Sequence, residues 1–131
     1  RDDMLVSAAG PGSNLAQAVV FALVVRALGG SGHVLARLDE PLNAMLILAI
    51  VINVGLAVFN MLPIWPLDGF HVTSQLLGGA SRSWFLQTQR YGMFIIVGLI
   101  VMPRLAGGGF DPLGSIIWQP VRYLLKYVAG P

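Results

Sequence analysis

The chain has 131 residues, of which 56% are hydrophobic and 11% are charged, and its mean hydropathy is +0.75. Soluble domains carry about 25% charged residues, so a water-facing surface is hard to build from this composition. The basic residues are scattered, which excludes a nucleic-acid partner, and the absence of cysteine excludes disulfides and thiolate metal sites. We therefore expect an integral membrane protein in contact with lipid.

The first apolar stretch, residues 5–25, carries no charge and is long enough as a helix to cross a bilayer. Gly10-Pro11-Gly12 interrupts it. Because glycine and proline both disfavour a helix interior, we expect the continuous helix to start near Asn14, with Ser13 or Asn14 as its cap. The expected end of this helix is residue 27 or 28.

A polar, glycine-rich connection at residues 29–41, in which His33 is interpreted as a loop residue, leads to the clearest span, Leu42 to Leu62. Pro63 and Pro66 should end that helix, because each lacks an N–H and favours extended backbone in the residue before it. The chain nevertheless stays largely apolar beyond them. Extended backbone at this depth must be buried in protein or line a wet cavity, which is typical of a functional segment.

Residues 78–90 contain Gly, Ser, two Arg and two Gln, and are predicted to form a loop into a third span at roughly residues 91–105. The aromatic and basic residues that follow predict an interfacial helix broken at Pro120, with a short tilted span as the alternative. The fold class expected is all-α: a multi-pass transmembrane helical protein with a proline-broken intramembrane segment. Residues 1–131 are expected to form a single membrane domain.

Asp68 is the acidic residue that does not lie in a polar flank or turn. An ionised carboxylate within the bilayer costs at least about 2.5 kcal/mol, so it needs a compensating role. Asp68 could cap a helix that resumes near Gly69, could serve a proton relay or ion path in a transporter, or could bind a metal ion.

The segment around Asp68 follows the pattern Asn-x-x-Pro-x-x-Pro-Leu-Asp-Gly, from Asn60 to Gly69. This pattern resembles the second signature of the site-2 protease family of intramembrane zinc metalloproteases. Ala9-Gly10-Pro11-Gly12-Ser13-Asn14 is similar to the family's Ala-Gly-Pro-x-x-Asn element, and it stands in the same order along the chain. The two motifs bracket about half of the chain.

The resemblance implies that Asp68 is the third protein ligand of a Zn²⁺ ion, joining two histidines of an upstream His-Glu-x-x-His helix. The glutamate of that helix would act as general base on zinc-bound water. The chain has two histidines, His33 and His71, and neither lies in such a motif. This chain alone is therefore expected to be inactive.

The chain starts Arg1-Asp2-Asp3, with its first methionine at position 4. We interpret it as the C-terminal part of a site-2-protease-like core, with the zinc-binding helix upstream in the same protein. The alternatives are a family member that has lost catalysis and acts as a binding module for membrane helices, and an ion-coupled transporter that uses Asp68. The substrate implied by the resemblance is the transmembrane segment of a membrane-anchored protein.

Two further roles are predicted near Asp68. Asn60 could donate a hydrogen bond to a developing oxyanion, and its structural alternative is a hydrogen bond between helices. Free backbone groups along the proline-bounded segment could bind an extended substrate, which assigns substrate contacts to four residues: Pro63, Ile64, Trp65 and Pro66.

Three residues are assigned supporting roles. Asn14 is expected to shape the break before the first helix rather than to touch substrate. His71 lies three residues after Asp68, on the same face if this segment is helical, and we expect it to line the site rather than to bind the metal. Gly69 belongs to the motif, but Phe70 follows it where the family usually has a second glycine.

Overall fold

The computed structural model describes residues 2–29, 41–105, 107 and 111–129, and the regular elements in these ranges are all helices. The predicted all-α class is confirmed. In chain order, the elements are α1 (Asp2–Gly29), α2 (Pro41–Asn60), α3 (Asp68–Leu76), α4 (Gly79–Gln87), the 3₁₀ helix η2 (Thr88–Tyr91), α5 (Gly92–Leu105) and α6 (Pro112–Ala129).

Three helical stretches are long and apolar enough to cross a membrane: Met4–Leu28, Pro41–Asn60 and Gly79–Leu105. Their large apolar side chains stay exposed, with Phe94 at 77% and Leu105 at 82% exposure. In water such a surface would be unfavourable, whereas lipid tails solvate it. The prediction of a multi-pass integral membrane protein is confirmed.

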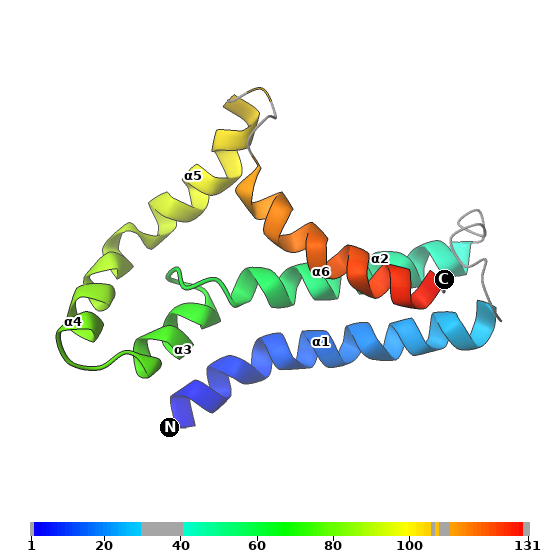
Figure 1. Ribbon diagram of the computed structural model, residues 1–131, viewed down its shortest axis with the longest axis horizontal. Coiled ribbons are helices and arrows are strands. Elements are labelled where there is room, and N and C mark those ends of the chain that lie inside the picture. Colours follow the sequence, from blue (N-terminus) through cyan, green and yellow to red (C-terminus); the bar gives the residue numbers. More distant parts are fainter. Residues whose placement is uncertain (1, 30–40, 106, 108–110, 130–131) are drawn as a thin grey trace.

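The core of the molecule lies where α1 and α2 pack side by side and antiparallel, with α6 across them (Figure 1). Small side chains let membrane helices approach closely, which is how packing stabilises them without a hydrophobic driving force. The residues buried at this junction come from all three helices and are Ala18, Ala22, Val25, Ile50, Val54 and Val121.

The C-terminal helix α6 is continuous through Pro120, so the predicted break there is wrong. Val121, the next residue, is fully buried in the core, and this packing holds the helix together across the proline. Arg26 at the end of α1 donates a hydrogen bond to the carbonyl of Tyr127 at 3.3 Å and lies 5.4 Å from that residue's ring. The C-terminal ends of α1 and α6 are thereby joined.

The predicted break in the first helix is also wrong, because α1 runs without interruption from Asp2 to Gly29 with Pro11 inside it. Asn14 lies within the helix, and Ser13 does not cap it: its hydroxyl donates to the carbonyl of Gly10 at 2.8 Å. Transmembrane helices tolerate proline because neighbouring helices, Ser and Thr side chains and local adjustments of the helix satisfy the backbone groups that it frees.

The predicted loop at residues 78–90 is wrong as well, because α4 and η2 occupy most of it and lead directly into α5. The polarity of this stretch was interpreted as a sign of a loop. Arginine and glutamine are nevertheless good helix formers, so polarity did not predict the conformation. Figure 1 shows α4, η2 and α5 as an arm that leads away from α1 and α2 and returns through α6. The prediction for residues 29–41, including His33, falls mostly outside the described residues.

Candidate metal and substrate site

The proline-bounded segment between α2 and α3 forms consecutive turns, not the extended strand that the sequence predicted. The N–H of Ile64 donates to the carbonyl of Leu62 at 2.8 Å, and the N–H of Leu67 donates to the carbonyl of Ile64 at 2.9 Å. The Trp65–Pro66 peptide bond is cis. The helix α2 ends at Asn60, two residues before the predicted end at Leu62, and α3 starts at Asp68.

Two glycines hold these turns against the neighbouring helices. A Cβ on Gly69 would overlap the carbonyl groups of Met61 and Leu62, and a Cβ on Gly92 would overlap the carbonyl of Trp65. Both glycines are buried. The start of α3 and the start of α5 therefore pack directly on the backbone of the turns, which fixes the position of the residues just before Asp68.

Asp68 projects from the first turn of α3 toward α1. A Cβ on Gly10 would lie 2.9 Å from Oδ2 of Asp68, so the carboxylate lies against the bare α-carbon of that glycine. The two sequence motifs, far apart along the chain, meet at this contact. Since Gly10 has no side chain, room is left for the carboxylate beside the helix backbone.

The interpretation of Asp68 as a helix cap is not supported. The N-cap position of α3 is held by Leu67, without a side-chain cap hydrogen bond, and Asp68 is the first residue inside the helix. A carboxylate in the first turn is still favoured by the helix dipole. Within the described ranges, Asp68 makes no hydrogen bond or ion pair and is only partly buried, so it remains able to accept a ligand.

Phe70, which stands where the family usually has glycine, anchors α3. Its side chain is 2% exposed and stacks on Phe85 of α4 with ring centroids 4.7 Å apart. His71 is exposed and touches Phe70 edge to face at 5.8 Å. In the part of the chain that the structure describes, no group of three His, Cys, Asp or Glu side chains could hold a metal ion.

The asparagines differ in their partners. Asn53 donates to the carbonyl of Ala49 in its own helix at 2.8 Å. Asn60, two turns later on the same face and at the end of α2, is partly buried and has no hydrogen-bond partner among the described residues. Asn14 is partly buried four residues after Gly10, on the same side of α1.

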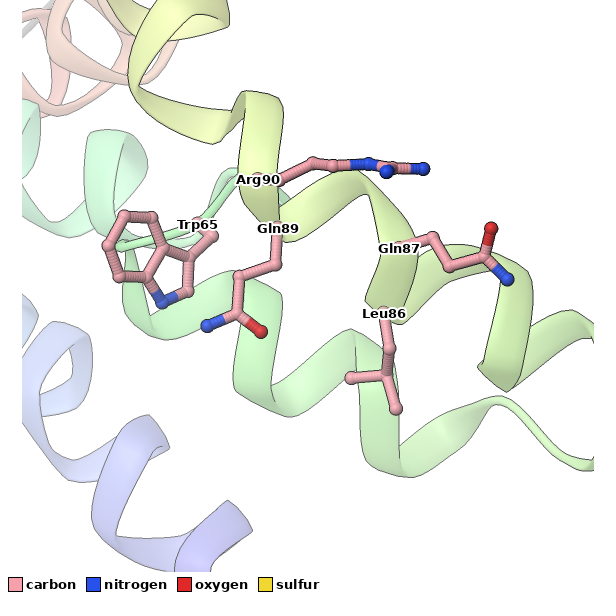
Figure 2. A pocket seen from close by; sticks show the side chains of 5 residues that line it. All are labelled: Trp65, Leu86, Gln87, Gln89 and Arg90. Carbon is pink, nitrogen blue, oxygen red and sulfur yellow. The ribbon is translucent and has the colours of Figure 1, made fainter.

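Sequence reasoning missed the contacts of Gly10 and Gly92 and a pocket beside the turns. The pocket has a volume of about 670 Å³ and is shown in Figure 2; it is lined by Trp65, Leu86, Gln87, Gln89 and Arg90. Two features of the sequence could have indicated these contacts: a glycine at the start of an apolar span, Gly92, and an arginine just before that span, Arg90. Arg90 was expected in a loop and Gly92 at the start of a span, and neither expectation placed these residues beside Trp65.

Comparison with known proteins gives two matches. The sequence model of peptidase family M50 matches residues 34–103. The Bacillus subtilis (strain 168) protein named "Putative zinc metalloprotease YwhC" is 35% identical over 119 residues, which cover 90% of this chain and 50% of that protein. The chain thus spans about half the length of this relative. No solved structure matches the chain.

Proposed function

Because the chain belongs to peptidase family M50, the site-2 protease family that its two motifs resemble, we propose that the intact protein cuts membrane-anchored substrates within or near the bilayer. The reaction is the hydrolysis of a peptide bond with zinc as cofactor. The substrate is a transmembrane segment of another protein, and lipid surrounds the helices described above.

The observation that carries this proposal is the contact between Gly10 and Asp68. An unpaired carboxylate that is partly buried between apolar helices is unfavourable unless a cation binds it. The Gly10 contact leaves one side of the carboxylate crowded, so a cation would approach from the other side. We assign Asp68 as an oxygen ligand of zinc.

The donor set fits zinc in part. Catalytic zinc sites use three protein ligands, commonly histidine nitrogen and carboxylate oxygen, and keep a further position open. Asp68 supplies one oxygen, and the described residues do not contribute two imidazoles near it. We propose that a His-Glu-x-x-His helix outside this chain supplies them, and that this chain alone is inactive. Bound zinc lowers the pKa of water and polarises carbonyl groups.

The residues of this chain then bind and orient the substrate. Among the described residues, Trp65 has the one N–H of the segment 61–67 that is not used within the turns. We propose that this N–H and the surfaces of Pro63, Ile64 and Pro66 contact an unwound substrate. Asn60, at the entrance to the turns, donates a hydrogen bond to the substrate carbonyl as negative charge develops on it.

The test uses the full-length protein in detergent or vesicles with a single-span peptide as probe. The sequence of the full-length protein should contain His-Glu-x-x-His outside the region described above. Cleavage of the peptide should stop when a chelator removes zinc and resume when zinc is restored. Proteolysis that survives complete removal of the metal would contradict the proposal, and so would a full-length sequence without the motif.

A further inference from the structure

The pocket beside the turns has two walls of different origin. Trp65 belongs to the segment that precedes Asp68, and the other lining residues belong to α4 and η2. Figure 2 shows the indole of Trp65 beside the amide of Gln89, with Arg90 and Gln87 extending to the other side. The contact between Gly92 and the Trp65 carbonyl locks these two walls together. The backbone positions on the two sides of the pocket are therefore held close to each other.

The pocket is close to the proposed metal ligand. Trp65 is three residues before Asp68, so their α-carbons are at most roughly 11 Å apart. An extended peptide advances about 3.3 Å per residue. A substrate whose scissile bond lies at Asp68 would thus place a side chain within about three residues of that bond into the pocket.

The chemistry of the lining favours an anion. Arg90 is the charged residue among the five lining residues, and among the described residues no carboxylate pairs with it. Its guanidinium lies 5.0 Å from the ring of Tyr91, an interaction that leaves its N–H groups free. Gln87 and Gln89 add amide donors. The volume of about 670 Å³ is within the range of ligand pockets, roughly 300–1,000 Å³.

We propose that this pocket is a substrate subsite that receives an acidic side chain near the scissile bond and pairs it with Arg90. The inference rests on the proposed proteolytic function and adds a preference for substrate charge to it. A carboxylate forms two parallel hydrogen bonds with a guanidinium, which makes the pair specific as well as favourable. Arg90 is thus a specificity-determining residue, separate from the metal site.

The experiment compares leucine-rich single-span peptides that differ at one position. The bond cut by the full-length protein is mapped first, and each residue within three positions of it is then set to Glu, Gln or Lys. At one of these positions we expect Glu to raise kcat/KM about tenfold over Lys. Arg90→Gln should remove this preference and Arg90→Glu should reverse it. The matched control is Arg82→Glu in α4, because Arg82 does not line the pocket and should leave the preference unchanged.

Binding of the same peptides to the Asp68→Ala variant, followed by fluorescence anisotropy, gives a readout that does not need cleavage. The same ranking of Glu over Lys is expected there. Equal binding and equal cleavage of all three peptides would overturn the inference and leave the proposed function intact. A charge preference that survives Arg90→Glu would overturn it too. If Arg90→Glu changes peptide cleavage only in vesicles that contain anionic lipid, the pocket binds a lipid headgroup and the inference is wrong.

Discussion

The α-carbon of Gly10 lies against the carboxylate of Asp68, so that a Cβ at position 10 would be 2.9 Å from Oδ2 and 3.8 Å from Cγ. This contact joins α1 to the start of α3 and places one motif of the sequence beside the other. It also gives Gly10 a specific function: any larger residue would displace the carboxylate.

The substitution Gly10→Ala should displace the Asp68 carboxylate with little loss of stability, because the obstructing atoms are the end of a side chain. We expect zinc affinity of the full-length protein to fall by about tenfold or more, as is typical when the support of a metal ligand is disturbed. Competition with a fluorescent chelator measures the affinity. The control is Gly12→Ala, where nothing lies within 4 Å of the added Cβ; equal effects of the two variants would contradict the role of the contact.

Gly69→Ala should destabilise the fold, because its Cβ would overlap the backbone carbonyls of Met61 and Leu62 and backbone cannot move aside cheaply. Overpacking of this kind costs about 1–3 kcal/mol. Thermal unfolding in detergent measures it, with Gly98→Ala in α5 as the control, since that position has nothing within 4 Å. Identical midpoints for the two variants would show that the turns are not packed as described.

Asn60→Ala is expected to reduce kcat by about 10²-fold while bound zinc stays unchanged, because it removes a donor to the developing oxyanion. Asn53→Ala is the matched control. Its amide is already bonded to Ala49 within α2, and it lies on the same face two turns earlier. If both variants keep full activity, the catalytic role of Asn60 is excluded and its function is structural.

Asp111 caps α6, since its Oδ1 accepts a hydrogen bond from the N–H of Gly114 at 2.8 Å and Pro112 occupies the first helical position. Asp111→Ala should cost about 1 kcal/mol, and Asp111→Ser should restore most of that stability. Hydrogen exchange of the first turn of α6 reports the effect locally. Unchanged exchange in the alanine variant would argue against the cap.

The sequence was most informative where lipid leaves the backbone few choices. The uncharged run ending near Leu62 predicted α2, observed as Pro41–Asn60, because an apolar stretch of this length can satisfy its backbone in lipid only as a helix. Asp68 stood out for the same reason, since its charge is costly there. Both inferences rest on how lipid solvates backbone and charged groups, which does not depend on tertiary contacts.

Prediction failed where tertiary packing and the membrane overrode local preference. Pro11 and Pro120 each interrupt a helical pattern locally, yet α1 and α6 continue through them. Pro11 is buried, whereas Pro120 is exposed and is followed by the fully buried Val121. The polar residues before Tyr91 were interpreted as a loop, although the arginines and glutamines among them are good helix formers. The contacts of Gly10 with Asp68 and of Gly92 with Trp65 join distant segments, and a single sequence does not specify which glycine meets which residue.

The central claim is that Asp68 is a zinc ligand in a site completed by imidazoles from outside this chain. The most direct measurement is the zinc content of the full-length protein by elemental analysis, for the natural sequence and for Asp68→Ala, with thermal unfolding to establish that both are folded. We predict about one zinc per protein in the first and a strongly reduced content, together with loss of peptide cleavage, in the second. Equal zinc content and full cleavage activity in folded Asp68→Ala would contradict the claim.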